Sequence, residues 1–387
     1  MGMSDRLRLR PPLIGREEQL EKMMAKLAFA LAGQGTVILI SGEAGSGKTR
    51  LAEEFQQLAS NTRCACVSAP CVPGQPAYAP FETALAALSS IDRTIATLPS
   101  YQEFCQRKNG YDVAKAEGER EERSLFAALE LVREASGRLP LVVRIDDLQL
   151  ADARTIQMLH FLARGMVNQR AIIVCSYSDD ELFDRQERPH PLIEAVRIMK
   201  REGLCEEIPL APLTEEQLAE ALGDILEKEL EEQALSSLYR ESGGNPQIAV
   251  ELVLEALRSG ALVLGEDKAT MESWRTLGIP SSLREWVSRK LEALPEDQLH
   301  ILQCAALFGE CFDAELLSQA LGKQKLETLE LLDAAVREYR LYVEAGERYL
   351  FRWGVVRRVA VDRIPLARAA ELRKAIDRAR SSRERSA

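Results

Sequence analysis

Residues 42–49 of this 387-residue chain have the types and spacing of a phosphate-binding loop. The segment Gly42-Glu-Ala-Gly-Ser-Gly-Lys-Thr49 matches the pattern G-x-x-x-x-G-K-[ST] at every fixed position. Gly42 and Gly47 permit backbone conformations that turn successive amide N–H groups inward onto phosphate oxygens. Lys48 would bring a positive charge to the β- and γ-phosphates, and Thr49 would offer its hydroxyl to Mg²⁺. The pattern therefore predicts a site for ATP or ADP with Mg²⁺. The predicted nucleotide contacts here are Gly42, Glu43, Ala44, Gly45, Ser46, Gly47, Lys48, Thr49 and Arg50.

A second candidate segment, 141–147, ends an apolar run in two carboxylates, Asp146 and Asp147. In proteins with such a loop, a neighbouring strand ends in an Asp that holds the Mg²⁺ shell, and Asp146 fits that role. Asp147 would face the γ-phosphate and orient or deprotonate the attacking water, so Asp147 and Lys48 are the candidate catalytic residues. The alternative is an acidic strand-to-turn pair without chemistry. Arg144 either faces solvent or reaches a carboxylate across the sheet.

The elements that must position these residues alternate between strands and helices. Apolar runs predict strands at 36–41, 139–146 and 171–176. The segment 63–68 looks like a further strand, and 205–210 is a weaker fifth. Strands that alternate with helices favour an α/β fold with a parallel five-stranded sheet covered on both faces. After residue 211 helical patterns dominate, at about 214–226, 230–241 and 246–259.

Two short segments, 341–345 and 348–352, predict a β-hairpin that turns at Gly346-Glu347. Helices followed by a two-stranded ribbon suggest a winged-helix unit. The expected organisation is a nucleotide-binding domain at 12–210, a helical subdomain at 211–280 and a winged-helix-like subdomain at 281–380.

Composition limits the partners and the compartment. The formal net charge of -10 and the pI near 5.2 argue against a protein that coats nucleic acid or anionic membranes. No signal peptide and no membrane-length apolar run are visible, and the eight cysteines are scattered, which favours the cytoplasm. Cys64, Cys66 and Cys71 are close enough to raise a metal site, but no second ligand pair follows, so we interpret them as buried thiols.

Several stretches together resemble one family. They are Leu13-Ile-Gly-Arg-Glu17, Asp146-Asp-Leu-Gln-Leu-Ala-Asp152, Leu210-Ala-Pro-Leu-Thr-Glu-Glu-Gln217, Glu241-Ser-Gly-Gly-Asn-Pro246 and Tyr349-Leu-Phe-Arg352. Their order resembles the STAND branch of AAA-type ATPases, in particular the ATPase core of large LuxR-type and maltose-regulator-like transcriptional activators. The resemblance extends from about residue 12 to about residue 375.

This resemblance implies a P-loop NTPase domain of AAA/STAND type, followed by an α-helical lid and a regulatory winged helix that closes over ADP and opens with ATP. It also implies that Ile14, Gly15 and Arg16 border the adenine and that Pro246 packs near the base or ribose. The structural alternatives are a lead-in to the first helix and a proline at a helix start. Proteins of this kind act as slow nucleotide switches.

The chain departs from the family at three points. The family commonly carries an Arg in the triplet after the fourth strand, where this chain has Ser176-Tyr177-Ser178. It also commonly carries a His near the end of the winged helix, where this chain has Trp353. Both changes remove a candidate phosphate sensor and predict slow hydrolysis; Arg352 or Arg357 either substitutes or is structural. The large activators continue into helical repeats and a DNA-binding helix-turn-helix, so this chain is either a fragment or a short form that works through a partner.

Three functions compete. The first is an ATP/ADP-binding switch in signal transduction or transcription regulation, with a protein partner or self-association. The alternatives are a pseudo-ATPase scaffold and a DNA-binding AAA ATPase that uses its winged helix. A basic tail supports the last, but carboxylates interrupt it, and others recur through 281–320, where they would repel phosphate. We therefore do not expect direct DNA binding.

Overall fold

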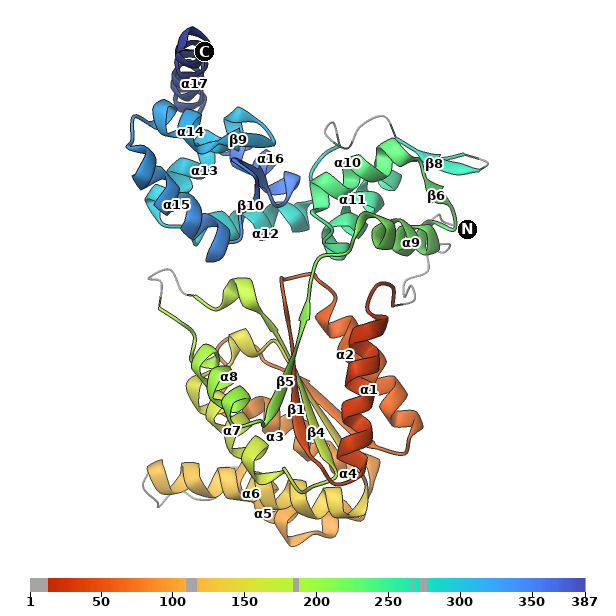
Figure 1. The fold of residues 1–387 in the computed structure, drawn as a ribbon. Coiled ribbons are helices and arrows are strands. Elements are labelled where there is room, and N and C mark those ends of the chain that lie inside the picture. Colours follow the sequence, from red (N-terminus) through yellow and green to blue (C-terminus); the bar gives the residue numbers. More distant parts are fainter. Residues whose placement is uncertain are drawn as a thin grey trace. The chain divides into compact units, whose positions relative to one another are not determined.

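The computed structural model describes residues 13–108, 117–183, 188–265, 267–271, 274 and 277–386. Residue 12, where the expected nucleotide-binding domain begins, lies outside this range. The chain divides into two compact units. We call residues 13–182 and 188–211 the N-terminal unit, and the part from residue 212 onward the C-terminal unit. Each is described by itself (Figure 1).

The N-terminal unit is built on a five-stranded parallel sheet with the order β2-β3-β4-β1-β5. Its strands are β1 (Thr36–Gly42), β2 (Ala65–Pro70), β3 (Leu141–Asp146), β4 (Ala171–Ser178) and β5 (Cys205–Leu210). The predicted five-stranded parallel sheet is therefore confirmed, with shifts of about two residues at some strand ends. Because β1 lies between β4 and β5, the loop that follows β1 leaves the sheet beside the end of β4.

Helices cover both faces of this sheet (Figure 1). Side chains alternate along β1, so Ile38 and Ile40 pack with α1 and α2, whereas Val37 and Leu39 face the opposite core. The helical segments of this unit are α1 (Glu17–Leu31), α2 (Lys48–Asn61), α3 (Ala79–Ala86), α4 (Leu88–Ile91), η2 (Ile95–Thr97), α5 (Pro99–Lys108), α6 (Glu117–Arg138), η3 (Leu148–Leu150), α7 (Ala153–Gly165), η4 (Asp179–Glu181) and α8 (Pro191–Arg201). Two buried cores thus hold the sheet rigid beneath the candidate site.

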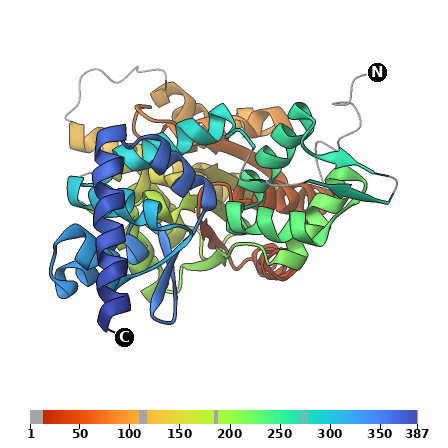
Figure 2. The same cartoon turned by 90° about the horizontal axis from the view of Figure 1, so that it is seen from above.

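The C-terminal unit is mainly helical and shares one hydrophobic core. Its first part holds α9 (Glu215–Leu226), β6 (Glu229–Leu230), α10 (Glu232–Ser242), α11 (Pro246–Ser259), β7 (Val263–Leu264) and β8 (Lys268–Thr270). The rest holds α12 (Ser281–Glu292), α13 (Glu296–Phe308), β9 (Cys311–Asp313), α14 (Ala314–Leu321), α15 (Lys325–Arg337), β10 (Tyr342–Ala345), β11 (Arg348–Phe351), α16 (Gly354–Asp362) and α17 (Leu366–Ser386). The long helix α17, blue in Figure 2, packs along α14.

Two small sheets complete the C-terminal unit, with the strand orders β10-β11-β9 and β6-β8-β7. The predicted hairpin is confirmed, because β10 and β11 pair antiparallel with Ala345 opposite Arg348. Phe312 of β9 joins it and contacts the rings of Tyr342, Tyr349 and Phe351. An aromatic cluster therefore anchors this ribbon to the helices below it.

Candidate nucleotide site

The loop between β1 and α2 has the backbone that phosphate binding requires. Gly42, Gly45 and Gly47 have φ values of 153°, 80° and 96°, a region that residues with a side chain rarely adopt. A Cβ on Gly42 would come within 2.9 Å of the Leu210 carbonyl oxygen at the end of β5. Gly47 caps the N-terminus of α2. The loop therefore opens onto a helix N-terminus, whose free N–H groups favour an anion.

Lys48 lies buried beneath this loop, with 5% of its surface exposed. Its Nζ donates to the carbonyl oxygens of Gly42 at 3.0 Å and Glu43 at 2.7 Å, and to Ser178 Oγ at 3.1 Å. Burial lowers the pKa of Lys48, and nearby carboxylates oppose that shift. These carboxylates are those of Asp180, Asp147, Asp179 and Glu181. The amine is thus held where it can exchange protein oxygens for phosphate oxygens.

A carboxylate already occupies one amide of the loop. The Ala44 N–H donates to Asp180 Oδ1 at 3.2 Å, and Asp180 belongs to η4, directly after β4. A protein anion therefore stands at the loop, which shows that this amide is open to an acidic oxygen. We did not predict this contact; its signal in the sequence is the acidic run Asp179-Asp-Glu181 directly after the fourth strand.

Asp146 ends β3 with 6% of its surface exposed. Its Oδ1 accepts from Ser176 Oγ at 3.0 Å, and its Oδ2 lies 3.1 Å from Arg144 Nε as an ion pair. Burial raises the pKa of Asp146, against the effects of Arg144 and Ser176. Arg144 therefore reaches a carboxylate of its own strand, neither facing open solvent nor crossing the sheet.

Asp147 follows in a left-handed conformation, with φ of 62° and ψ of 49°. Its N–H donates to Ser176 Oγ at 3.2 Å, and its Oδ1 accepts from Gln149 Nε2 at 3.2 Å. Gln149 Oε1 in turn accepts from the Ser178 N–H at 3.0 Å. Ser176 therefore contacts the Asp146 carboxylate and the Asp147 N–H directly. Ser178 is linked to the Asp147 carboxylate through Gln149.

The predicted Mg²⁺ ligands fit a hard cation. Thr49 is exposed on the first turn of α2, and the Asp146 carboxylate ends the strand two places from β1. Hydroxyl and carboxylate oxygens are the ligand types that Mg²⁺ takes beside phosphate oxygens. Arg50, a predicted nucleotide contact, instead pairs with Glu54 of its own helix at 3.1 Å.

The segment before α1 is attached to the phosphate loop. Arg16 is 5% exposed and donates to the carbonyl oxygens of Ser46 at 3.2 Å and Ala211 at 2.6 Å. Burial lowers the pKa of Arg16. Gly15 has φ of 69°, and Ile14 is half-buried. The guanidinium thus fixes the phosphate loop at Ser46, a role that the sequence did not suggest.

The Gly-Gly-Asn-Pro segment has local structural roles in the C-terminal unit. Pro246 opens α11, and Asn245 caps it by accepting from the N–H groups of Gln247 and Ile248. A Cβ on Gly243 would come within 2.1 Å of the Arg352 carbonyl oxygen. The segment therefore joins α10 and α11 against the chain that leads into α16. Pro246 is not among the residues that the N-terminal unit brings together around the phosphate loop.

Trp353, which stands where the family commonly has His, is fully buried in the C-terminal unit. Its ring packs edge-on against Trp286, with 5.5 Å between centroids, and Lys290 Nζ lies 5.1 Å from its centroid. Arg352 lies 5.7 Å from the same ring, and Arg357 donates to the Ala306 carbonyl oxygen at 3.5 Å. Trp353 is a core residue here, and its neighbouring arginines contact their own unit.

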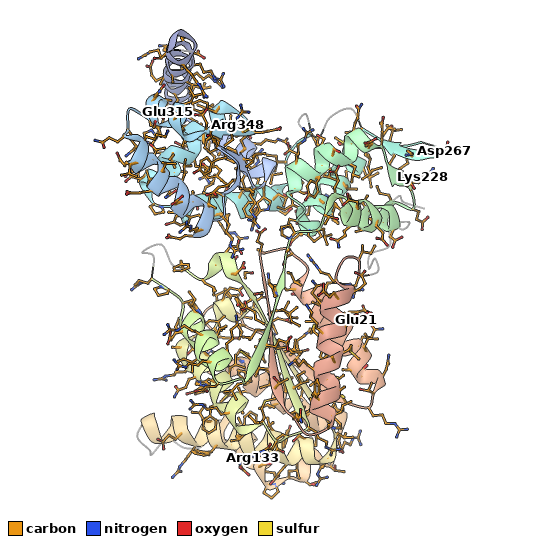
Figure 3. The ribbon with its side chains drawn as sticks, in the orientation of Figure 1. Glu21, Arg133, Lys228, Asp267, Glu315 and Arg348 are labelled. Atoms are coloured by element: carbon orange, nitrogen blue, oxygen red, sulfur yellow. The ribbon has the colours of Figure 1, made fainter. Side chains whose placement is uncertain are left out.

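A groove of about 680 Å³ in the C-terminal unit contains none of the predicted site residues. Glu315 and Arg348, labelled in Figure 3, help to line it. Glu315 pairs with Lys325 at 2.8 Å, and Asp313 pairs with Arg383. Its charges are thus largely matched by one another.

The cysteines and the helices were compared with the sequence expectations over the described residues. Among those residues the cysteines, including Cys64, Cys66 and Cys71, are free thiols, and no group of three His, Cys, Asp or Glu side chains is placed to hold a metal ion. Burial raises the pKa of Cys66 and of Cys71 to about 12. Across the same residues, none of the helices combines the length and the apolarity that a membrane crossing needs.

Comparison with known proteins gives a family for the segment that contains this site. Residues 12–174 match the family model described as an AAA ATPase domain, so this part of the chain is an AAA-type ATPase domain, which implies nucleotide binding. An uncharacterized protein of Rhizobium meliloti is 30% identical over 193 residues. That alignment covers 43% of this chain and only 18% of the relative, so the chain spans under a fifth of its length.

Two solved structures match this chain. A Walker-type ATPase of Pyrococcus abyssi has a TM-score of 0.58 and 17% identity, covering 91% of this chain and 98% of that one. A STAND protein of Pyrococcus horikoshii with a tetratricopeptide repeat sensor has a TM-score of 0.37 and 15% identity, covering 95% of this chain and 45% of that one. The first likeness shows the fold of a P-loop ATPase.

Proposed function

We propose that this protein is an ATP- and ADP-binding regulatory switch of the STAND class with slow, Mg²⁺-dependent ATP hydrolysis. The observation that carries the proposal is the buried Lys48 beneath a left-handed glycine loop, with Asp146 and Asp147 on a neighbouring part of the same sheet. The switch would act in signal transduction or transcription regulation, in the cytoplasm, through a protein partner or self-association.

The residues divide the work as follows. The amides of residues 42–49 and the Lys48 amine would hold the phosphates, while Thr49 and Asp146 would hold Mg²⁺, which neutralises charge on the β- and γ-phosphates. Asp147 would take a proton from water as the water oxygen bonds to the γ-phosphorus. The bond from that phosphorus to the β–γ bridging oxygen breaks, and ADP and phosphate leave.

Slow hydrolysis is supported by what surrounds Lys48. At the end of β4, Lys48 contacts the neutral side chain of Ser178. In the corresponding triplet the family commonly has an Arg. An arginine that stabilises the transition state accelerates phosphoryl transfer by about 10³- to 10⁵-fold, so a site without one turns over slowly. The same observation favours the second candidate function, a scaffold that binds nucleotide without turnover. Hydrolysis by the wild-type protein that stops on removal of Mg²⁺ would exclude the scaffold.

The output of the switch would come from the C-terminal unit. We propose that residues 211–280 form a helical lid and 281–380 a winged-helix-like subdomain, after the nucleotide-binding domain at 12–210. The three-stranded sheet β10-β11-β9 among α12–α16 supports the second assignment. Ile14, Gly15, Arg16 and Pro246 remain proposed contacts of the nucleoside.

Lys48→Ala tests the site. The variant should lose ATP and ADP binding by at least about 100-fold, because a buried charge-assisted contact to phosphate disappears. Isothermal titration calorimetry measures this. Lys22→Ala is the matched control, since Lys22 is exposed and pairs with Glu18 of its own helix, α1. Equal affinities for wild type and Lys48→Ala would refute the site.

The switch itself has a separate readout. Light scattering after gel filtration should give different masses for the ATP-loaded and ADP-loaded wild-type protein in the presence of a purified partner or at high protein concentration. Identical behaviour with both nucleotides, in protein that binds them, would leave a nucleotide-binding domain without a switch.

A further inference from the structure

We propose that Gln149 is a positioning residue that fixes the Asp147 carboxylate relative to Lys48, acting through Ser178. The inference deepens the proposed function and rests on it, because it gives a role to a residue beside the proposed base. Gln149 would not touch the reacting atoms.

The hydrogen-bonding chemistry of its neighbours determines how the Gln149 amide is oriented. The Ser178 N–H can only donate, so Oε1 must face it, at 3.0 Å. Asp147 Oδ1 accepts, so Nε2 must face it, at 3.2 Å. A neutral side chain of this length that carries both an acceptor and a donor satisfies both neighbours. A glutamate of the same shape satisfies only Ser178 and places a second anion against Asp147.

Rigid elements support both ends of this bridge. Gln149 lies in η3, and the preceding residue of that turn, Leu148, is fully buried. Ser178 ends β4 with 3% of its surface exposed. The Asp147 backbone is fixed separately by its N–H bond to Ser176 Oγ at 3.2 Å. Side-chain and backbone contacts to β4 together therefore determine where the Asp147 carboxylate lies.

Ser178 links this bridge to the phosphate loop. Its hydroxyl accepts from Lys48 Nζ at 3.1 Å, while its N–H donates to Gln149. One residue thus contacts both the amine that would hold the γ-phosphate and the amide that holds the base. This continuous path keeps the distance between the two catalytic groups constant, which is the purpose of positioning in phosphoryl transfer.

The experiment compares Gln149→Leu and Gln149→Glu in the full chain. Both should lower kcat for ATP hydrolysis by about 10- to 100-fold, since misplacing a reacting group costs turnover. In Gln149→Leu, which adds no charge, KM should stay within about 2-fold. The Gln149→Glu variant preserves shape and the Ser178 contact, so a packing role would leave it near wild type. In an Asp147→Asn background, Gln149→Leu should add under about 2-fold, because its effect passes through Asp147.

Gln169→Glu is the control for added charge. Gln169 is equally half-buried, precedes β4 at its other end and accepts from Ser136 Oγ. It should hydrolyse ATP like wild type. Wild-type turnover in Gln149→Glu, or a further loss in the Asp147→Asn background, would overturn the proposal.

Failure of the proposed hydrolysis gives a different pattern. If wild type binds ATP but does not hydrolyse it, Gln149→Glu should still weaken ATP relative to ADP by about 3- to 10-fold, because it adds a negative charge against Asp147, which is proposed to face the γ-phosphate. Equal ATP-to-ADP affinity ratios in Gln149→Glu and Gln169→Glu would then overturn the inference. A wild type that binds neither nucleotide overturns the proposed function, and the inference with it.

Discussion

The Ala44 amide and the Lys48 amine both hold protein oxygens at the positions where phosphate oxygens are expected. Ala44 donates to Asp180, and Lys48 donates to two loop carbonyls and Ser178. A nucleotide must replace these acceptors, so part of its binding energy goes into displacing them. At the Ala44 amide the competing group is an anion from the protein itself.

Removing the Asp180 carboxylate should therefore tighten nucleotide binding. We expect Asp180→Ala to lower the Kd for ADP by about 3- to 10-fold, because the hydrogen bond that the nucleotide must replace contributes about 1 kcal/mol. Calorimetric titration of ADP measures the change. Asp179→Ala is the control, since it removes a carboxylate that also acts on Lys48. If both variants shift the Kd equally, general charge explains the effect, and the Ala44 contact contributes nothing of its own.

At this scale the sequence predicted local chemistry and missed contacts between distant segments. The position of residues 42–49 between a strand and a helix, and of Asp146 at a strand end, could be predicted because each belongs to a contiguous pattern with a physical reason for its spacing. The contact of Asp180 with Ala44 could not be predicted, because the two residues lie 136 positions apart along the chain. The same holds for the contact of Gln149 with Ser178, which lies 29 positions away. The sequence interpretation of Ser178 was the loss of an Arg; in the structure its hydroxyl contacts Lys48.

In the C-terminal unit, the end of α10 packs against the start of α16. Glu241 is 3% exposed, and its Oε2 lies 3.5 Å from Arg358 NH1 as an ion pair. Burial raises the pKa of Glu241, while Arg358 and Arg357 oppose the rise. Two residues further on, Gly243 faces the Arg352 carbonyl oxygen with no room for a Cβ.

Gly243→Ala should thus destabilise the C-terminal unit more than a left-handed glycine normally would. The cost of φ near 59° is about 1–2 kcal/mol, and the clash with Arg352 should add about 1–3 kcal/mol. Gly322→Ala is the control, because Gly322 ends α14 at φ of 66° with nothing near its Cβ position. Urea denaturation followed by circular dichroism compares the two. Equal losses would show that α16 yields to the new methyl group without cost.

Elements were predictable where the pattern was long enough. The five strands of the parallel sheet are at least six residues long, β1, β3 and β4 carry apolar, β-branched runs, and the hairpin β10–β11 has a glycine turn. β6, β7, β8 and β9 were not predicted, since strands of two or three residues are too short to show alternation. Their pairing depends on the helices around them.

On the scale of the whole molecule, the buried hydrophobic side chains of the described residues form separate clusters. The buried members of the two clusters on the faces of the parallel sheet lie within residues 23–210, and those of the third lie within residues 213–379. The sequence predicted a change in character near residue 211 from its switch to helical patterns. It could not show that the helices and the small sheets after that point share one core, because that core joins residues up to about 160 positions apart.

Separate cores predict separate unfolding transitions. Differential scanning calorimetry of the full chain should resolve two peaks, and saturating ATP with Mg²⁺ should raise the peak of the N-terminal unit. At about 100 times the Kd, bound ligand stabilises by about 2.7 kcal/mol, which corresponds to a shift of about 5–10 °C in a unit of this size. Lys48→Ala should cancel that shift without moving the peak in the absence of ATP by a comparable amount.

Gly243→Ala should move the other peak alone, because its contacts lie within the C-terminal unit. The two variants therefore assign each peak to a unit independently. A single peak that ATP raises and Gly243→Ala lowers would mean that the units unfold as one body. In that case nucleotide binding would also stabilise the C-terminal unit, and the two units would not be thermodynamically independent.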